Sequence, residues 1–518
     1  MRGNGLHRMK MGELVSCLPV KEVIGDPTVE VRGLAYHSRE VADGFLFAAI
    51  RGSQEDGRRF IPEALSRGAR SLLVDEHLEN SKVVQVVVPN VREALARISA
   101  TFYGDPSSFM TLVGITGTNG KTTTAYLIES ILEEGGKSVG VMGTVNYRFQ
   151  GHVQPAPTTT PESLDLQRNL RAMVDAGVTH AIVEVSSHAL EMQRVRACDF
   201  DIALFTNLTR DHLDYHRSME NYFQAKQLLF TQYLGESKKK ELFAVINLDD
   251  PKGEELSRIA HGSRIGYGVD KRGEVWPERF EESPEGLRAR VHTPRGSFDL
   301  TSSLIGKHNL YNILAAVTVG EVLRLPQKTI AAGVAKLIRV PGRLERVPGG
   351  DGIRVFVDYA HTGDALARAL ETLKGSRPRR LIVVFGCGGD RDRGKRSVMG
   401  RVAALGSHLA VLTSDNPRTE DPLKIIEEVE RGIQETGREK YQAADLPGSW
   451  KDSGYLVIPD RREAIHLAIR AARPGDAVLI AGKGHEDYQI VGRKKFHFDD
   501  REEAAAALDS VGERKDHR

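Results

Sequence analysis

The sequence is poor in the residues that mark several large classes of protein. Among 518 residues it has 3 cysteines and 2 tryptophans, and aromatic residues make up only 6%. The cysteines, Cys17, Cys198 and Cys387, are far apart and odd in number. This spacing argues against a disulfide framework or a zinc cluster and suits a reducing compartment. We interpret all three as packing residues.

Long apolar runs and an excess of one charge are also missing. No run reaches the ~20 apolar residues that cross a bilayer, and the N-terminus lacks the apolar core of a signal peptide. We therefore expect no membrane span and a cytoplasmic location. A formal net charge of +2 provides no global basic field, so we expect no nucleic-acid partner.

The chain is too long for one core, and a prior of about 150 residues per domain suggests three domains. Strand-like runs such as "TLVGIT" and "THAIVEVS" alternate with amphipathic helices, and the alternation resumes later with "IRVFVDYA" and "RLIVVFGCGG". This order favours an α/β fold with parallel sheets covered on both faces. We predict domains over residues 1–106, 107–338 and 339–518, the first ending where "YGDPSS" breaks a helix.

The strongest local signal is "VGITGTNGKTTTAYLIESILEE", a strand followed by a glycine loop and a helix. Backbone N–H groups of such a loop can bind phosphates, with the Lys121 ammonium on the β and γ oxygens and the Thr122 hydroxyl on Mg²⁺. The loop therefore predicts ATP binding. The strict phosphate-loop template has a glycine where Ile115 stands, so this is a variant form, and a tight turn with incidental glycines is the alternative.

The variant loop and many later stretches together resemble the Mur ligases, ATP-dependent amide-forming enzymes that build the peptidoglycan stem peptide. The stretches follow the family's order: "HSRE", "EVSSHAL", "TRDHLDYH", "GKHNLYN", "PGRLE", "DYAHT", "GCGGDRDRGKR", "SDNPR" and "AGKGHE". The resemblance implies a UDP-substrate-binding N-terminal domain, a P-loop-type central domain that binds ATP, and a Rossmann-like C-terminal domain that binds the amino acid.

The resemblance also implies ATP-binding and metal-binding residues. The ATP-binding set is Gly117, Thr118, Asn119, Gly120, Lys121, Thr122, Thr123, Asn309, Arg343, Asp358 and His361. The Mg²⁺-binding set is Thr122, Glu184, His212 and Lys226, the lysine as a carbamate formed with CO₂. Lys121, Lys226 and His212 are the implied catalytic residues. Taken alone, Lys226 reads as a solvated helix lysine and His212 as a loop histidine.

A third implied set binds the UDP-linked substrate. Its members are Ser38, Ser53, Gln54, Glu55, Thr158, Thr159, Thr160, Ser186 and Arg194. Thr159 and Thr160 could equally cap the helix predicted to begin at Pro161. Three positions depart from the family pattern: His37 replaces an aspartate, Met192 a glutamine of some relatives, and Gly363 a proline.

The stretch "TSDNPRTEDP" follows a buried strand, where ligands of an open α/β sheet bind. Asp421 and Pro422 are predicted to start the next helix, which leaves Arg418 either solvated or able to bind a substrate. A guanidinium matches a carboxylate, and meso-diaminopimelate has one carboxylate more than L-lysine. "DNPR" resembles the diaminopimelate-adding members, which implies a binding set of Arg391, Asp415, Asn416, Pro417, Arg418, Gly482 and Glu486.

The implied reaction adds meso-diaminopimelate to UDP-N-acetylmuramoyl-L-alanyl-D-glutamate through an acyl phosphate. We expect a monomer whose partners are these small molecules and ATP. The alternatives are the same reaction with L-lysine, or a folylpolyglutamate synthase-like ligase, which should lack "HSRE" and "DNPR". A nucleotide switch would turn over ATP without an amino acid, and a UDP-sugar carrier fits poorly with the intact Gly-Lys-Thr.

Overall fold

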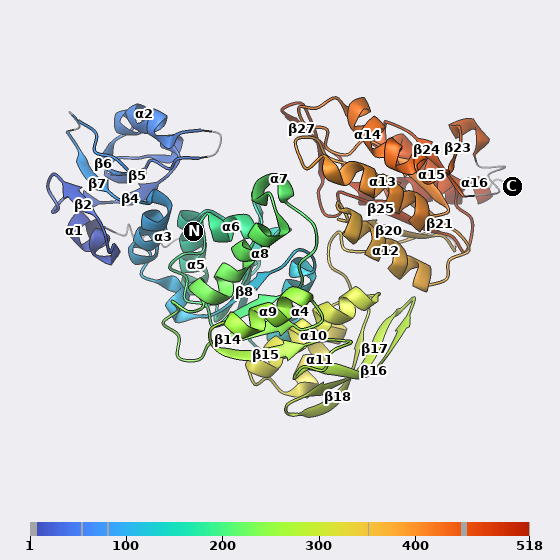
Figure 1. The fold of residues 1–518 in the computed structure, drawn as a ribbon, viewed down its shortest axis with the longest axis horizontal. Helices are drawn as coiled ribbons and strands as arrows, with labels where there is room; N and C mark the ends of the chain where they lie inside the picture. Colours follow the sequence, from blue (N-terminus) through green and yellow to red (C-terminus); the bar gives the residue numbers. More distant parts are fainter. Residues whose placement is uncertain (1–7, 53–54, 80–81, 351, 447–452, 517–518) are drawn as a thin grey trace. The chain divides into compact units, whose positions relative to one another are not determined.

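The computed structural model describes residues 8–52, 55–79, 82–350, 352–446 and 453–516. Figure 1 shows the helices and strands along the chain. The chain divides into two compact units and passes from one to the other several times. The first comprises Met1–Gly117, Leu132–Thr206 and Phe223–Tyr267, and the second Thr118–Ile131, Asn207–Tyr222 and Gly268–Arg518. These units cut across the predicted boundaries at residues 106 and 338, so the three-domain division stays a prediction.

The N-terminal sheet has the strand order β2-β7-β6-β5-β4 and is parallel except for its edge strand β2. Buried side chains pack on both of its faces, and every residue of strand β6 except Arg70 is buried. The elements of this region are β1 Met9–Lys10, α1 Met11–Leu14, β2 Glu22–Ile24, β3 Glu30–Val31, β4 Gly33–Ala35, β5 Phe45–Ala48, α2 Ile61–Ser66, β6 Ala69–Val74, β7 Val84–Val87 and α3 Val91–Phe102.

The central sheet has the order β11-β10-β9-β12-β8-β13-β14-β15, and only β10 and β11 at one edge are antiparallel. Strands β8, β12 and β13 are buried along nearly their whole length, as their continuous apolar runs predict. The strands are β8 Thr111–Thr116, β9 Val139–Met142, β10 Asn146–Phe149, β11 His152–Pro155, β12 His180–Glu184, β13 Ile202–Phe205, β14 Phe243–Asn247 and β15 Ser263–Tyr267.

The helices between these strands are α4 Lys121–Glu134, α5 Ser163–Asp175, α6 Ser187–Glu191, α7 Leu213–His216, α8 Met219–Leu228 and α9 Pro251–Ile259. The capping interpretation of Thr159 and Thr160 is wrong. Helix α5 begins at Ser163, and Glu162 is the N-cap, its side chain accepting from the Ser163 N–H. The two threonines are therefore available for other contacts.

An antiparallel sheet of β16 Trp276–Ser283, β17 Gly286–Thr293 and β18 Gly296–Ser302 follows β15. The expectation of strict strand-then-helix alternation is wrong here. Strand β16 is largely exposed, so it carries no apolar run that would reveal it in the sequence. Helices α10 Lys307–Val322 and α11 Gln327–Lys336 come next.

The C-terminal sheet has the order β19-β20-β25-β21-β22-β24-β23, with β19 antiparallel at one edge. Its elements are β19 Glu345–Val347, β20 Arg354–Asp358, α12 Gly363–Gly375, β21 Leu381–Phe385, α13 Gly394–Gly406, β22 Leu409–Leu412, α14 Pro422–Gln434, β23 Glu439–Lys440, β24 Gly454–Val457, α15 Arg461–Ala471, β25 Ala477–Ala481, β26 Tyr488–Val491, β27 Lys494–His497 and α16 Asp500–Asp516.

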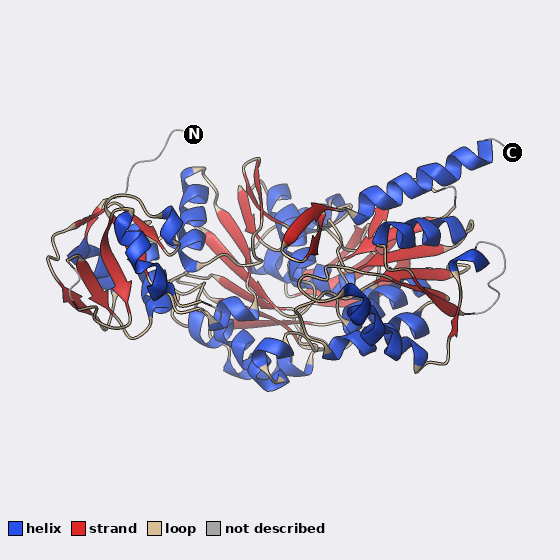
Figure 2. Cartoon of the chain, turned by 90° about the horizontal axis from the view of Figure 1, so that it is seen from above, coloured by secondary structure: helices blue, strands red, loops and turns tan. Residues whose placement is uncertain are grey.

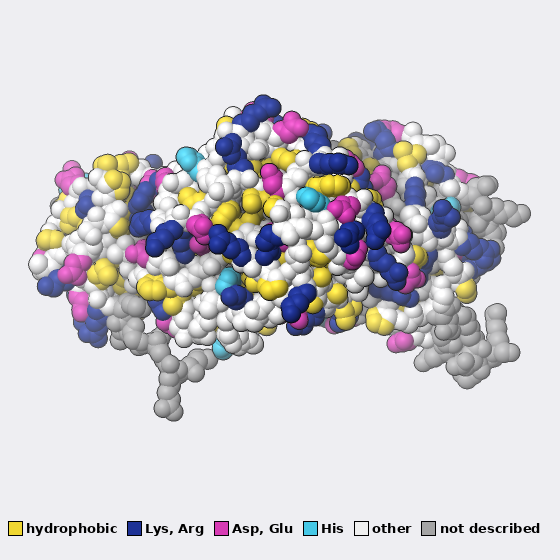
Figure 3. Space-filling model, turned by 90° about the horizontal axis from the view of Figure 1, so that it is seen from below, with side chains coloured by type: hydrophobic (Ala, Val, Ile, Leu, Met, Phe, Trp, Pro, Cys, Tyr) yellow, Lys and Arg dark blue, Asp and Glu magenta, His cyan; other side chains and the backbone are white. Residues whose placement is uncertain are grey.

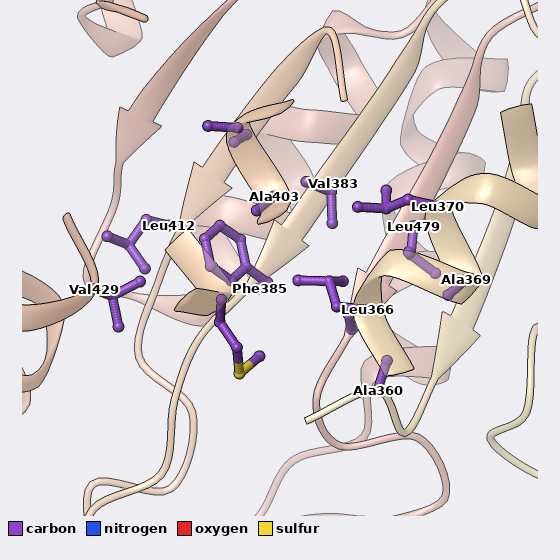
Figure 4. Packing of buried hydrophobic residues seen from close by; sticks show 14 of the residues in the cluster. Ala360, Leu366, Ala369, Leu370, Val383, Phe385, Ala403, Leu412, Val429 and Leu479 are labelled. Atoms are coloured by element: carbon purple, nitrogen blue, oxygen red, sulfur yellow. The ribbon is translucent and has the colours of Figure 1, made fainter. Parts of the chain in front are cut away.

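Helices cover both faces of this sheet (Figure 2). Leu381, Val383 and Phe385 of β21 pack with residues of α12, α13 and α14, as Figure 4 shows for part of the cluster. The alternate residues Ile382 and Val384 pack with α15 and α16 on the other face. The predicted start of α14 is confirmed, because Asp421 caps it and Pro422 is its first residue.

The surface mixes charges of both signs. On the face drawn in Figure 3, Lys and Arg side chains lie among Asp and Glu side chains, in keeping with a net charge of +2. Among the described residues, no helix combines the length and the apolar character needed to cross a membrane.

Candidate active site

The glycine loop joins β8 to α4. Gly117 and Gly120 have φ values of 145° and 89°, which favour glycine. A Cβ atom at Gly120 would lie 2.4 Å from Asn312 Oδ1 of helix α10, so the loop approaches that helix closely. Helix α4 begins at Lys121, directly after the loop. The N–H groups of its first turn form the anion-binding end of the helix.

The side chains of the loop hold it in shape. Lys121 Nζ donates to the Thr118 carbonyl oxygen at 3.0 Å. The Asn119 N–H donates to Asn207 Oδ1 at 3.0 Å, and Asn207 Nδ2 donates back to the Asn119 carbonyl oxygen at 3.1 Å. Thr123 is buried in the first turn of α4. The loop is therefore fixed by its own residues and by the chain that follows β13.

Residues of the C-terminal segment also contact this loop within the second unit. Arg343 Nη2 donates to the buried Thr122 hydroxyl at 3.2 Å, and Asn119 Nδ2 donates to Asp364 Oδ2 at 3.1 Å. Asn309 accepts from Asn312 Nδ2 at 3.0 Å on helix α10. The predicted ATP-binding residues Arg343 and Thr122 thus lie together, through a direct hydrogen bond.

The "VDYAHT" segment supplies a buried acid and a neutral histidine. Asp358 accepts from the Leu344 N–H at 2.6 Å and the Ala360 N–H at 2.8 Å, and burial raises its pKa. His361 Nδ1 lies 2.8 Å from the Tyr359 carbonyl oxygen, so this nitrogen carries the proton and Nε2 can accept. Burial and the nearby Lys395 lower the pKa of His361 to about 4. The ring is therefore neutral at pH 7.

His212 and Asp211 form a second group of titratable residues. His212 adopts a left-handed φ of 54°, and its Nε2 lies 3.5 Å from Asp211 Oδ2, with 43% of the side chain exposed. Burial would raise the pKa of Asp211, but His361, His212 and Lys395 outweigh burial and lower it. An ionised carboxylate therefore faces three nitrogen-bearing side chains.

Glu184 ends strand β12, where it pairs with Ile115 of β8. Its side chain is 1% exposed and accepts from the Thr144 N–H at 3.0 Å and the Thr144 hydroxyl at 2.9 Å. A Cβ atom at Gly143 would lie 2.2 Å from Glu184 Oε1. The adjacent residues Gly143 and Thr144 thus lie in close contact with the Glu184 carboxylate.

Thr160 forms hydrogen bonds with three other residues predicted to bind the UDP-linked substrate, Thr158, Ser186 and Arg194. Its hydroxyl donates to the Glu184 carbonyl oxygen at 2.7 Å and accepts from the Ser186 N–H at 3.0 Å. Its carbonyl oxygen accepts from Arg194 Nη1 at 3.1 Å and from the Thr158 hydroxyl at 2.9 Å. The Thr159 and Thr144 hydroxyls are 3.2 Å apart.

Ser38 lies apart from this cluster in sequence, in a short 3₁₀ turn of the N-terminal region. Its buried hydroxyl donates to Glu63 Oε2 at 2.7 Å. Glu55 is exposed, whereas Ser53 and Gln54 lie outside the described residues.

Arg418 follows β22 with a left-handed φ of 52°. Its Nη1 donates to the Gly389 carbonyl oxygen at 2.8 Å, and a Cβ atom at Gly388 would lie 2.8 Å from that nitrogen. Burial and the neighbouring Arg391 charge lower the pKa of Arg418. Within the described part of the chain, neither guanidinium forms an ion pair with a carboxylate. The Arg391 charge therefore acts unfavourably on Arg418, and the carboxylates of Asp415 and Glu486 act on it in the opposite sense.

Asn416 and Glu486 lie close to Arg418. Asn416 Nδ2 donates to Glu486 Oε2 at 3.0 Å, and burial and Asp415 raise the pKa of Glu486. Gly482 has a φ of 122°, and its added Cβ would lie 2.8 Å from Asp415 Oδ2. Pro417 packs against Gly389, where an added Cβ would meet its carbonyl oxygen. These contacts bring together Asp415, Asn416, Pro417, Arg418, Gly482 and Glu486. Arg391 is exposed and acts on Arg418 through its charge.

Comparison with known proteins accounts for this arrangement. The chain matches the Mur ligase family, catalytic domain over residues 30–103, the Mur ligase middle domain over 115–320, and the Mur ligase, glutamate ligase domain over 342–484. A UDP-N-acetylmuramoyl-L-alanyl-D-glutamate–2,6-diaminopimelate ligase of Geobacter metallireducens is 48% identical over 502 residues, 96% of this chain and 98% of that protein. The chain belongs to the Mur ligase family.

Other Mur ligases give the same picture. The protein of the same name from Solibacter usitatus is 44% identical over 507 residues, 97% of this chain and 99% of that protein. A solved structure of a ligase of that name has a TM-score of 0.68 and 33% identity, covering 97% of this chain and 99% of that one. The predicted α/β Mur ligase fold is confirmed.

A folylpolyglutamate synthase of Mycobacterium tuberculosis, solved with ADP, shares the fold with a TM-score of 0.61. It is 20% identical and covers 76% of this chain and 92% of its own. This likeness supports a common fold and leaves about a quarter of the Mur ligase chain unmatched.

Several Mur ligase residues at these sites were missed in the sequence. Asn207, Asp364 and Lys395 contact or face predicted site residues, and Thr144 holds Glu184. Asn207 follows β13 at its carboxyl end, a position that could have revealed it. Asp364 and Lys395 sit in helices whose neighbours in space cannot be read from the chain.

The solvated interpretation of Lys226 is wrong, because this side chain is 1% exposed on helix α8. Among the described residues, no group of three or more His, Cys, Asp or Glu is arranged to hold a metal ion. The predicted Mg²⁺-binding set of Thr122, Glu184, His212 and Lys226 stays a prediction.

The three departures from the family pattern have identifiable surroundings. The His37 ring lies 4.3 Å from that of Tyr36. Met192 Sδ accepts from Arg194 Nη2 at 3.6 Å. Gly363 is the first residue of α12, and a Cβ atom there would lie 2.8 Å from Val398 Cγ1.

Proposed function

We propose that this Mur ligase joins meso-diaminopimelate to the D-glutamate carboxyl of UDP-N-acetylmuramoyl-L-alanyl-D-glutamate at the expense of ATP. The observation that carries the proposal is the Arg418 guanidinium, which lies beside the Arg391 charge. Among the described residues it has no carboxylate partner within salt-bridge distance, and Asp415 and Glu486 act on it from further away. The extra carboxylate of meso-diaminopimelate supplies that partner. L-Lysine has no such group, so it would leave the Arg418 guanidinium without a carboxylate at salt-bridge distance.

The other end of the amino acid fits the same region. Glu486 accepts from Asn416, and a carboxylate can hold the ammonium group on the distal carbon of meso-diaminopimelate. Asp415 lies against Gly482 in the same region, since a Cβ atom at Gly482 would lie 2.8 Å from Asp415 Oδ2. Arg418, which suits a carboxylate, and Glu486, which suits an ammonium group, thus lie in neighbouring loops of the C-terminal region.

For ATP we propose the glycine loop. The N–H groups around Gly117 to Thr123 bind the phosphates, Lys121 neutralises the β and γ oxygens, and Arg343, Asp358, His361 and Asn309 complete the nucleotide contacts. The D-glutamate carboxylate attacks the γ-phosphorus, ADP leaves, and an acyl phosphate forms. The amine of diaminopimelate then attacks the acyl carbon and phosphate leaves.

We propose Mg²⁺ ligands separately in each unit. Thr122 and His212 lie in the second unit, Glu184 and Lys226 in the first. The Glu184 side chain suits a hard cation such as Mg²⁺, because it is a buried carboxylate. It accepts two hydrogen bonds from Thr144, and Gly143 lies close against it. Bound Mg²⁺ neutralises phosphate charge. For Lys226 we propose a carbamate, since burial disfavours the charged form of an amine and carbamylation requires the neutral form.

For the UDP-linked substrate we propose Thr158, Thr159, Thr160, Ser186 and Arg194 on the sugar and peptide. Ser38 and Glu55, with Ser53 and Gln54, contact the uridine end. The hydrogen bonds around Thr160 support the first group by linking its members. We also propose a cytoplasmic monomer, because each predicted site is built from this chain and ATP and UDP-sugars are cytoplasmic.

The test is Arg418→Ala, assayed by phosphate release with meso-diaminopimelate and with L-lysine. A charge-assisted hydrogen bond contributes about 1.5–3 kcal/mol, so the KM for diaminopimelate should rise roughly tenfold to a hundredfold or more. Activity with L-lysine should change little. Arg377→Ala is a matched control, because Arg377 is an exposed arginine of the same domain with φ 47°. An unchanged preference in Arg418→Ala would refute the assignment.

A further inference from the structure

The orientation of the Asn416 side-chain amide is set by what surrounds it. Asn416 is 5% exposed, and its Oδ1 accepts from Lys483 Nζ at 3.0 Å and the Ile490 N–H at 2.9 Å. With Oδ1 committed to two donors, Nδ2 must face the other way, where it donates to Glu486 Oε2 at 3.0 Å. The amide therefore presents a donor, and not an acceptor, to Glu486.

Lys483 is well placed to enforce this orientation. It is 0% exposed, and its Nζ also donates to the Tyr488 carbonyl oxygen at 2.7 Å and lies 3.2 Å from Asp415 Oδ1. An ammonium group has three donors and no acceptor, so only an oxygen can face it. If Asn416 turned over, its amide nitrogen would face the ammonium and its oxygen would face the Glu486 carboxylate. Both contacts would be repulsive.

We infer that Lys483 is a positioning residue that fixes the Asn416 and Glu486 pair in the form that receives the distal ammonium of the amino acid. This inference rests on the proposed function. Lys483 itself is enclosed by protein and does not touch the substrate. It acts through the amide of Asn416 and through its charge, which lies close to the carboxylates of Asp415 and Glu486.

The charges around Glu486 support this role. Burial and Asp415 raise the pKa of Glu486, and Lys483, the hydrogen bond from Asn416 and Arg418 offset part of that rise. The groups that face Glu486 are Asp415, Asn416, Lys483, Arg418, Arg461, Tyr359 and Tyr488. Removal of the Lys483 charge therefore makes Glu486 harder to ionise, and a protonated Glu486 binds an ammonium group poorly.

The experiment compares Lys483→Met, Lys483→Arg and the control Arg380→Met with the unmodified chain. Arg380 forms a partly buried ion pair with Asp476 in the same domain, with Arg380 Nη2 2.5 Å from Asp476 Oδ2. It lies next to the amino end of β21, away from the carboxyl-end loops. Phosphate release gives kcat and the KM for diaminopimelate, for ATP and for the UDP-linked dipeptide between pH 6 and 9.

In Lys483→Met we expect the KM for diaminopimelate to rise about tenfold or more, while the other two KM values stay within about twofold. The acidic limb of kcat/KM for diaminopimelate should move upward by about one pH unit. Lys483→Arg should recover part of both effects, and Arg380→Met should lower only the thermal stability.

Three outcomes distinguish a failure of the proposed function from a failure of the role of Lys483. If the unmodified chain releases phosphate without need of diaminopimelate, the proposed function fails. If it needs diaminopimelate but Lys483→Met keeps its KM and pH profile, the role of Lys483 is refuted and the function stands. If Lys483→Met does not fold, Asn416→Asp carries the test, because it presents oxygen to Glu486 with Lys483 in place. An unchanged KM for diaminopimelate in that variant also refutes the inference.

Discussion

The ion pair between Arg461 and Asp500 offers a quantitative test of how the C-terminal domain is held together. Arg461 begins helix α15 and Asp500 begins helix α16, and both side chains are 0% exposed. Two hydrogen bonds of 2.8 and 2.7 Å join them, and Arg461 Nη2 also donates to the Ala481 carbonyl oxygen at 3.0 Å. Burial alone would lower the pKa of Arg461, but Asp500 outweighs it and raises the pKa.

The expected cost of Arg461→Met follows from what it leaves behind. Asp500 would remain buried without its cation, and breaking such a pair costs about 3–5 kcal/mol. In a domain of 150–250 residues, each kcal/mol shifts the Tm by roughly 2–4 °C, so we expect a fall of roughly 6–20 °C. Replacing both partners by apolar residues of similar volume removes the stranded charge and should recover most of the loss.

Differential scanning calorimetry of the full chain provides the measurement, with the C-terminal transition followed in Arg461→Met, Asp500→Leu and the double variant. The reasoning predicts two large single effects and a much smaller double effect. It would be refuted if the single variants lost under about 1 kcal/mol, or if the double variant lost the sum of both.

Three further predictions concern the loop, the substrate region and pH. Gly120→Ala should weaken ATP binding in calorimetric titration by about tenfold or more, because its Cβ would lie 2.4 Å from Asn312 Oδ1. Gly136→Ala, at φ 71° with open space around it, should bind ATP normally, and equal effects would contradict us. Thr160→Val should raise the KM for the UDP-linked dipeptide and lower the Tm, because it removes the hydrogen bonds to the Ser186 N–H and the Glu184 carbonyl oxygen, whereas Thr160→Ser should behave like the unmodified chain. Burial lowers the pKa of His308 from 6.5 to about 4, so the unfolded state binds its proton first and stability should fall as the pH drops from 6.5 to 4. The Tm of His308→Gln should fall less over that window, and an identical fall would rule out this contribution.

The fold could be predicted where burial imposes a regular pattern. Strands β8, β12 and β21 are buried on both faces, so their apolar runs are visible in the sequence, and the Asp-Pro start of α14 follows from capping chemistry. Strand β16 was missed because exposed side chains leave it without an apolar run. The start of α5 was misplaced by two residues, since Glu162 competes with the threonines as cap.

The candidate site could be predicted only where its residues lie close together in the sequence. Residues in a contiguous motif, such as Gly117 to Thr123 or Asp415 to Arg418, could be predicted because their spacing in the chain reflects their chemistry. Asp364 and Lys483 could not, since their roles come from contacts with Asn119 and Asn416 that are far away in sequence. The burial of Lys226 was likewise hidden, because its helix has no clear apolar stripe.

The central claim is that this chain uses ATP to add meso-diaminopimelate to a UDP-linked muramoyl dipeptide. The most direct measurement is phosphate release from ATP and Mg²⁺ with that dipeptide, comparing meso-diaminopimelate, L-lysine and no amino acid, with the product mass determined. We predict release only with meso-diaminopimelate and a product that contains it. Preference for L-lysine, or release that is indifferent to the amino acid, would contradict the account.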